Sequence, residues 1–403
     1  MEPAPLEGIR VIDWTIWQQG PVATAMLGDL GADVIKIEDR RGDPGRGMSR
    51  IAGLSTGRSP GNFYFDTNNR NKRSLTVDLA QEEGKEIIYC LVGRSDVLVH
   101  NFRRGVPERI GMDYATLSKH NPKLIYATAS GYGPKGADST APAFDRCGLA
   151  RSGIMNTLGE PDMPPLMMMG GIADQTGAIM LAYAVLAALI ARERLGVGQE
   201  VDVSQLGSMI YLQALNVAAA LSLGQPLPRR RRAEEGNPLS NHYQCKDGKW
   251  IALAMLQADR YWPTLCQTMG MQEHEKDPRF AAMDKRSENC RAIIAIMDRV
   301  FATKTRKEWM TEFEKAGGLI YAPVNDIQDV ICDPQVLANG YITDFEHPER
   351  GKVRMVGVPL QLSKTPASIR SAAPELGQHT EEVLLELGYD WEAITSLKDR
   401  GVI

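Results

Sequence analysis

The stretch GIRVIDWTIWQQGPVATAMLGDLGADVIKIE, residues 8–38, decides the fold class. It holds two short apolar runs, Ile9–Asp13 and Asp33–Glu38, which have the length of strands. Between them lies a segment of small and apolar residues that begins near Pro21 and ends near Gly31. Because proline is tolerated in the first turn of a helix and glycine commonly ends one, this segment predicts a helix. The stretch therefore predicts strand, helix and strand, the unit from which parallel sheets are built.

The alternation of strand and helix patterns continues along the first half of the chain. Further helices are predicted at Glu82–Val92, Thr176–Leu195 and Leu206–Leu223, and further strands at Asp96–His100, Lys123–Ser130 and Gln199–Ser204. Repeated units of this length imply a parallel sheet with helices on its faces. We therefore expect an α/β protein with a Rossmann-like, parallel-sheet large domain.

The character of the chain changes after residue 223. Residues 224–236 hold prolines and the run Arg229–Arg232, which is typical of a linker or a solvated, exposed turn. Beyond it a strand is predicted at Lys249–Met255, with helices at Tyr261–Met269 and Glu288–Phe301. These elements predict a smaller α+β domain over residues 225–330.

The C-terminal part of the chain is expected to return to the large domain. Helices are predicted at Thr380–Leu387 and Trp391–Leu397, with Thr380 as the N-cap of the first. Because 403 residues exceed the usual size of a single core, two domains are expected. The large domain would comprise residues 1–224 and be completed by residues 331–403.

Composition and spacing exclude several classes of protein. A formal net charge of -4 lacks the basic surface that nucleic acid requires. The 6 cysteines and 6 histidines are scattered without disulfide-framework or metal-ligand spacing. Met1–Arg10 has no pattern of a secretory signal, and the apolar stretch Gly177–Ala191 is short for a membrane span. We expect a cytoplasmic enzyme with no metal and no nucleic-acid or membrane partner.

A glycine-rich segment offers a weak nucleotide-binding signal. Gly131–Gly136 matches GxGxxG and follows a predicted strand. A dinucleotide fingerprint also needs a helix directly after the glycines, to hold the pyrophosphate at its N-terminus. Residues 137–142 have no helical pattern, so a flexible turn is favoured.

Two aspartates stand in settings that call for an explanation. Asp174 lies between the apolar run Met167–Met169 and the long apolar helix, where a carboxylate is costly unless it has partners. Position alone leaves two roles open for it, the N-cap of a helix that starts near Thr176 or a catalytic residue, and the two can coexist. Asp145 precedes another small-residue stretch, and it can equally be a turn residue or a partner of the arginine that follows it.

Several stretches, taken in order, resemble the family III CoA-transferases and their relatives, the α-methylacyl-CoA racemases. They are Gly8–Glu38, Asn71–Leu79, Asp96–Phe102, Arg109–Asp113, Ile172–Gly177 and Gly198–Val203, with Pro323–Asn325, Asp333–Pro334 and Leu376–Thr380 near the C-terminus. A resemblance that covers almost the whole chain is far more specific than any one of these motifs.

The resemblance implies a set of site residues. Asp174 falls on the catalytic aspartate of the family, Asp145 on a neighbouring acidic position, and Gln18 on a loop that lines the active site. The residues implied to contact CoA are Gln19, Arg40, Asn101, Phe102 and Arg109. The family places an arginine directly after the second strand, where this chain has Asp39, followed by Arg40 and Arg41.

The activity implied is exchange of CoA between an acyl-CoA donor, for which succinyl-CoA is a family-level expectation, and a free carboxylic acid. Asp174 would act as a covalent nucleophile and carry CoA as an aspartyl-CoA thioester. The related racemases have histidine where this chain has Phe144, and a racemase needs a proton carrier on each face of its substrate, so a transferase is favoured. A CoA-binding structural subunit of a heteromeric transferase is a further alternative, which the presence of Asp174 disfavours.

The resemblance also implies an assembly and a mode of substrate binding. Family members form interlocked, ring-like homodimers, and some relatives pair with a paralogous subunit. CoA thioesters and small carboxylic acids would bind as substrates, without a permanently bound cofactor. Trp17 and Met167–Met169 suggest an apolar or aromatic acid, although core packing explains such residues more often.

Overall fold

The computed structural model describes residues 3–48, 50–51, 54–55 and 62–403. The chain divides into two compact units. Unit 1 comprises Met1–Met155, Met167–Pro226 and Leu337–Ile403, and unit 2 comprises Asn156–Leu166 and Leu227–Val336. The segment Asn156–Leu166, expected in the large domain, thus belongs to unit 2.

Arginines of the predicted linker explain this difference. Arg229 donates to the carbonyl of Leu158 over 3.1 Å, and Arg231 forms an ion pair with Asp162. The backbone N–H of Arg232 donates to Glu160 over 3.0 Å. The arginine run therefore fixes residues 158–162 within unit 2, while Arg230 and Arg231 remain exposed, as expected for a solvated run.

Six strands form the central sheet of unit 1 in the order β5-β2-β1-β6-β7-β8, and every neighbouring pair is parallel. The strands are β1 (Arg10–Trp14), β2 (Asp33–Glu38), β5 (Lys72–Thr76), β6 (Val97–His100), β7 (Ile125–Ser130) and β8 (Gln199–Ser204). This sheet confirms the α/β class and the Rossmann-like large domain.

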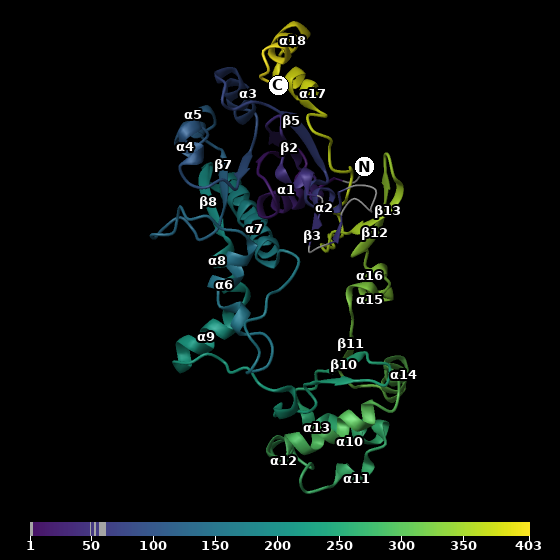
Figure 1. The fold of residues 1–403 in the computed structure, drawn as a ribbon. Coiled ribbons are helices and arrows are strands. Elements are labelled where there is room, and N and C mark those ends of the chain that lie inside the picture. Colours follow the sequence, from purple (N-terminus) through teal and green to yellow (C-terminus); the bar gives the residue numbers. More distant parts are fainter. Residues whose placement is uncertain (1–2, 49, 52–53, 56–61) are drawn as a thin grey trace. The chain divides into compact units, whose positions relative to one another are not determined.

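Both faces of the sheet are covered by helices (Figure 1). Successive strand residues point to opposite faces, so Ile12 and Ile35 belong to one apolar layer and their neighbours Val11 and Val34 to the other. The first layer packs with α3 (Glu82–Val92), α17 (Thr380–Leu387) and α18 (Trp391–Asp399). The second layer packs with α1 (Gln19–Asp29) and α7 (Ile172–Leu195). The C-terminal helices thus complete the core of unit 1.

The N-cap residue of one helix and the continuity of another differ from the expectation. His379 is the N-cap residue of α17, and Thr380 is its first helical residue. The Thr380 hydroxyl accepts a hydrogen bond from the backbone N–H of Thr76 over 3.0 Å, so it fixes the helix to β5. The helix predicted at Leu206–Leu223 is two helices, α8 (Gln205–Leu212) and α9 (Ala214–Leu223), which meet at an angle of 75°.

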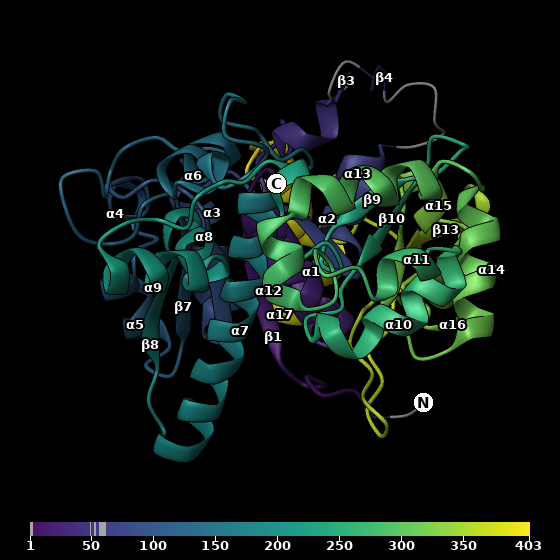
Figure 2. The ribbon, with the colours of Figure 1, turned by 90° about the horizontal axis from the view of Figure 1, so that it is seen from below.

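Helix α7 is the longest apolar element, with 24 residues. By length and composition it could cross a membrane, and the bent pair of α8 and α9 passes the same test together. The core helix of a globular protein also passes that test. In unit 1, one side of α7 packs against α1, α8, β7 and β8 (Figure 2), while apolar side chains such as Ile179 and Tyr183 on it are exposed.

The remaining elements of unit 1 are short. The helices are α2 (Phe63–Asn69), α4 (Val106–Ile110), α5 (Tyr114–His120) and α6 (Asp145–Arg151), and α16 (Pro334–Ala338) spans the boundary with unit 2. Two antiparallel pairs of strands are β3 (Arg50–Ile51) with β4 (Leu54–Ser55) and β12 (Ile342–His347) with β13 (Gly351–Val356).

Unit 2 is an α+β structure. Its antiparallel sheet has the order β11-β10-β9, with β9 (His242–Gln244), β10 (Trp250–Leu253) and β11 (Tyr321–Val324). The apolar core joins this sheet to α10 (Ala258–Met269), α13 (Cys290–Phe301) and α14 (Arg306–Ala316). The shorter helices are α11 (Gln272–Glu275), α12 (Met283–Glu288) and α15 (Ile327–Val330).

Candidate active site

The strand order of unit 1 reverses between β1 and β6, and ligands of open parallel sheets bind outside the carboxyl ends of strands at such a point. A cavity of about 430 Å³ lies there. Its walls come from the loops after β1 and β6, from the end of β7, from the segment that includes Ser139 and Phe144, and from Asp174 and Gln205. The topology therefore draws together residues that are far apart in the sequence.

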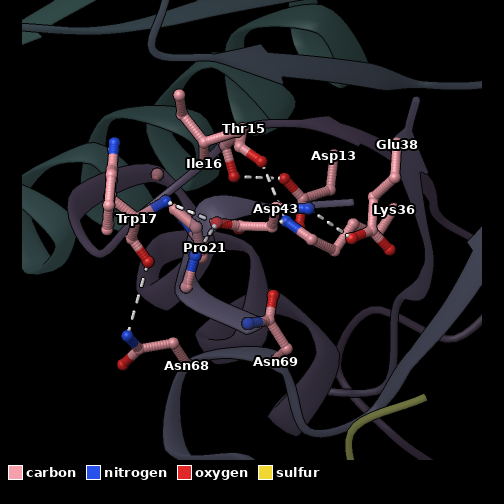
Figure 3. Close-up of polar contacts among 12 residues, drawn as sticks. Asp13, Thr15, Ile16, Trp17, Pro21, Lys36, Glu38, Asp43, Asn68 and Asn69 are labelled. Atoms are coloured by element: carbon pink, nitrogen blue, oxygen red, sulfur yellow. Dashed lines mark hydrogen bonds and ion pairs between the residues drawn. The ribbon is translucent and has the colours of Figure 1, made fainter. Parts of the chain in front are cut away.

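The loop after β1 is fixed in an unusual conformation. Trp17 has a φ of 67°, a left-handed conformation that costs a bulky residue about 1–3 kcal/mol. Its N–H donates to Asp43 over 3.2 Å, and its carbonyl accepts from Asn68 over 3.4 Å (Figure 3). Asn101 both donates to and accepts from the backbone of Ile16, over 2.6 and 2.9 Å. Hydrogen bonds on every side thus hold the loop against its strain.

Buried charges lie behind this loop (Figure 3). The ammonium group of Lys36 donates to Asp43 over 3.0 Å and to the carbonyl of Thr15 over 2.8 Å. Lys72 donates to Asp13 over 2.7 Å, and its two other protons go to the carbonyl of Pro21 and the side chain of Asn69. The side chains of both ion pairs are fully buried, and the pairs anchor the loop in the sheet.

Gln18 and Gln19 connect the same loop to α7 and β8. Gln18 donates to the carbonyl of Gly170 over 3.3 Å and lies against Gly171, where a Cβ atom would be 2.4 Å from its Oε1. Gln19 is buried against Gly177 and donates to the carbonyl of Val203 over 3.3 Å. Both glutamines line the cavity.

Asp145, and not Asp174, caps the N-terminus of α7. The helix begins at Ile172, four residues before the predicted Thr176, with Gly171 as its N-cap residue. Asp145 accepts hydrogen bonds from the N–H groups of Ala173 and Asp174, over 2.7 and 3.2 Å. The cap predicted as an alternative role for Asp174 is therefore supplied from 29 residues earlier in the chain, which leaves the Asp174 carboxylate available.

The Asp174 side chain is a half-buried carboxylate. Its Oδ1 accepts a hydrogen bond of 2.6 Å from Nε2 of Gln205. Burial raises the pKa of Asp174 to about 6, and the charge of Asp145 adds to the rise, while the hydrogen bond from Gln205 acts to lower it. Such a carboxylate is ionised at neutral pH, yet it is more basic and less solvated than an ordinary aspartate, as a nucleophile requires.

The predicted CoA contacts divide into two groups. Phe102 lines the cavity and packs against Trp14 with ring centroids 4.4 Å apart, and Asn101 also lines the cavity. Arg109 is exposed on α4, and Arg40 donates to the carbonyl of Ile403 over 3.1 Å. Neither arginine is among the described residues that line the cavity.

A second cavity of about 670 Å³ adjoins the first in unit 1. The two share Ile16, Phe102 and Val106 as walls. Asp39 and Arg41 line the second cavity and form an ion pair of 2.6 Å, so Arg41, and not Arg40, is the arginine that faces it. Together the two cavities could receive an extended molecule.

Three residues at the site were missed in the sequence. Gln205 directly follows β8, and a polar residue at the carboxyl end of a parallel strand is a recognisable signal. Arg104 lines the cavity and lies 3.6 Å from Asp202. Tyr64 carries no signal in the sequence. Burial, and then the charge of Asp174, raise the pKa of its phenol.

Chemically, the site offers one reactive carboxylate inside a cavity of mixed polarity. Among the described residues, no group of three or more histidine, cysteine or acidic side chains is arranged to hold a metal ion. Trp17 and the exposed Phe144 meet edge to face, with ring centroids 6.4 Å apart. The geometry suits attack by Asp174 on an electrophilic carbonyl.

Known proteins resemble this chain over almost its whole length. The pattern of CoA-transferase family III matches residues 6–380. The chain is 33% identical over 404 residues to an acyl-CoA transferase of Fusarium pseudograminearum, covering 99% of this chain and 88% of the relative. It is 32% identical over 421 residues to a formyl-CoA:oxalate CoA-transferase of Streptomyces coelicolor, covering 100% of both. A solved structure of a CaiB/BaiF family protein from Brucella suis matches with a TM-score of 0.85 and 30% identity, over 96% of this chain and 100% of that one. This chain therefore belongs to CoA-transferase family III.

Proposed function

We propose that the protein moves CoA from an acyl-CoA donor to a free carboxylic acid through an aspartyl-CoA thioester on Asp174. One observation carries the proposal. Asp174 stands in the cavity at the switch point of the sheet, with its backbone held by Asp145 and its pKa raised to about 6 by burial. A basic, poorly solvated carboxylate at the start of a helix has the properties of a covalent nucleophile.

The reaction runs through two acyl exchanges in each direction. The Asp174 carboxylate attacks the donor thioester, and a C–O bond forms as the C–S bond breaks, which gives a mixed anhydride and CoA thiolate. The thiolate then attacks Cγ of Asp174, and the donor acid leaves as a carboxylate. The acceptor acid reverses both steps and leaves as its CoA thioester. No water enters, so the free energy of the thioester is kept.

We infer that CoA occupies the two adjoining cavities. The pantetheine arm would reach Asp174 past Phe102, a wall shared by both cavities. Arg41 offers a cation for the nucleotide phosphates at the second cavity. Asn101 would act by holding the backbone of Ile16, since both ends of its amide are engaged there. The exposed Arg109 would contact CoA outside the cavities.

Succinyl-CoA is proposed as the donor on the family resemblance alone. The edge-to-face pair of Trp17 and Phe144 favours an apolar or aromatic acid as the other substrate. Phe144 cannot carry a proton, so racemase chemistry, which needs a proton carrier on each face of the substrate, is not favoured. We further propose an interlocked homodimer, or a pair with a paralogous subunit, in the cytoplasm, where free thiols such as the exposed Cys90 remain reduced.

Trapping of the covalent intermediate tests the proposal. The protein is incubated with an acyl-CoA and then with hydroxylamine, and the modified peptide is identified by mass spectrometry. We expect the adduct on Asp174, and we expect Asp174→Ala to abolish transfer while the protein remains folded. A folded Asp174→Ala variant with near-normal transfer would sink the mechanism, as would an adduct on Asp145.

A further inference from the structure

Gln205 is the direct side-chain partner of Asp174, although 31 residues separate them. It is the first residue of α8, and the side chain of Ser204 caps this helix by accepting from the N–H of Gly207. The Gln205 side chain is 4% exposed. Its Nε2 donates to Oδ1 of Asp174 over 2.6 Å, a short bond of the kind that an ionised acceptor makes.

Packing holds the Gln205 amide in this orientation. A Cβ atom at Gly148 would lie 2.9 Å from Cβ of Gln205 and 3.0 Å from Cβ of Ala173, so glycine alone leaves room here. Helices α6, α7 and α8 therefore close around the side chain. Its Oε1 is buried and has no hydrogen-bond partner among the described residues.

A buried amide whose oxygen has no hydrogen-bond partner lowers stability, which is unfavourable at a position with a purely structural role. Leaving a buried carbonyl oxygen unpaired costs about 1–3 kcal/mol, and an apolar side chain of the same size would avoid that cost. Among the described residues, the hydrogen bond that the Gln205 side chain makes goes to the carboxylate proposed as the nucleophile. The arrangement suits a donor whose benefit appears during the reaction.

We propose that Gln205 is a catalytic hydrogen-bond donor to Oδ1 of Asp174, and this inference rests on the proposed function. Because Oδ1 is engaged by Gln205, Oδ2 is the oxygen that attacks the donor thioester. When the CoA thiolate then attacks Cγ, a C–S bond forms and the electron pair of the carbonyl moves onto Oδ1. The Cγ–Oδ2 bond next breaks, and the acid leaves with Oδ2. The Nε2–H group already lies where the negative charge on Oδ1 develops.

The variant Gln205→Met tests this role, since methionine keeps the length of the side chain and removes the donor. Gln213→Met is the matched control. Gln213 is also buried and lies at the end of the same helix, but its side chain donates to the carbonyl of Ser152. It is not among the described residues that line the cavity. Thermal unfolding of both variants shows whether each is folded, and Gln205→Asn, whose shorter amide falls away from Oδ1, is the second variant if Gln205→Met does not fold.

We expect Gln205→Met to lower kcat by about 10-fold or more, with little change in the KM for acyl-CoA, because the donor acts on a developing oxyanion. The acid limb of kcat/KM should move to higher pH, since the lost bond favours the ionised carboxylate. The rate of aspartyl-CoA formation in a single turnover should fall by the same factor as kcat. Gln213→Met should keep the wild-type values.

Two outcomes would overturn the inference. A folded Gln205→Met protein with kcat within about 3-fold of wild type would show that the donor is dispensable. A change in KM alone would assign Gln205 to substrate binding. Both outcomes differ from failure of the proposed function, in which the wild-type protein itself forms no adduct on Asp174.

Discussion

Asp13 and Asp174 are buried or half-buried aspartates of the same unit, and their surroundings give them opposite properties. Burial acts to raise the pKa of Asp13, but the charges of Lys72 and Lys36 outweigh it and hold the pKa below its ordinary value. Burial raises the pKa of Asp174 to about 6, and the charge of Asp145 adds to the rise. An aspartate with cationic partners becomes structural, whereas one without them stays reactive.

The two lysines beside Asp13 are both buried, and their pKa values shift in opposite directions. Burial acts to lower the pKa of Lys36, but the charges of Asp13, Asp43 and Glu38 raise it above its ordinary value. Burial lowers the pKa of Lys72 to about 8, against the attraction of Asp13 and with the repulsion of Lys36. Every N–H donor of Lys72 is nevertheless engaged in a hydrogen bond, so Lys72 has no free donor for chemistry. The role of the cluster is to hold the strained loop at Trp17.

The largest effect is predicted where this cluster is broken. Asp13→Asn leaves the buried ammonium group of Lys72 without its carboxylate partner, and loss of one member of a buried pair costs about 3–5 kcal/mol. We expect the free energy of unfolding, measured with urea, to fall by that amount. A loss below about 1 kcal/mol would mean that the cluster does not depend on Asp13 and would break the comparison.

The second prediction is a gain in stability, from a substitution at Asp174. Asp174→Asn removes a poorly solvated charge and keeps an oxygen that can accept from Gln205. We expect the variant to be inactive yet more stable than wild type at pH 8, by about 1–2 kcal/mol after allowance for partial exposure.

The pH dependence of this gain in stability follows from the raised pKa of Asp174. The folded pKa of about 6 exceeds the ordinary 3.8, so the folded protein retains a proton that the unfolded chain has released. The contribution of Asp174 to stability is therefore present at low pH and is lost as the pH rises through about 6. The advantage of the variant in thermal unfolding should shrink between pH 8 and pH 5. An advantage that is equal at both pH values would contradict the raised pKa.

Local patterns predict the sheet and its flanking helices because periodicity and end signals lie within a few residues of each other. The bounds of β2, β8, α3 and α17 agree with the sequence. The start of α7 differs because its cap comes from Asp145, and no pattern around Thr176 contains that residue. The break at Gln213 differs because its amide bonds to Ser152, 61 residues away, while the apolar run Leu206–Leu223 is continuous.

The candidate site also contains residues that the sequence predicts and residues that only the tertiary structure brings in. Asp174, Gln18 and Phe102 are expected at the site because each lies in a stretch that resembles the family III CoA-transferases, and all three line the cavity. The sequence predicts Arg40 as a CoA contact, whereas Arg41 lines the second cavity, because sequence order does not show which of two adjacent exposed side chains faces a cavity. Gln205 reaches Asp174 through the packing of α8 against α7, which depends on the full set of tertiary contacts.

The smallest predicted effect concerns the interaction between the two aspartates of the site. Asp145→Asn keeps an oxygen that can accept from the N–H groups of Ala173 and Asp174, and it removes the negative charge. Because that charge contributes less than burial to the raised pKa of Asp174, the acid limb of kcat/KM should move to lower pH by less than about one unit. Asp145→Ala, which also removes the cap, should in addition lower stability by about 1 kcal/mol. The comparison of the two variants separates charge from capping. If both leave the acid limb at the wild-type pH, the raised pKa of Asp174 comes from burial alone, and Asp145 serves the site only through the hydrogen bonds that it accepts.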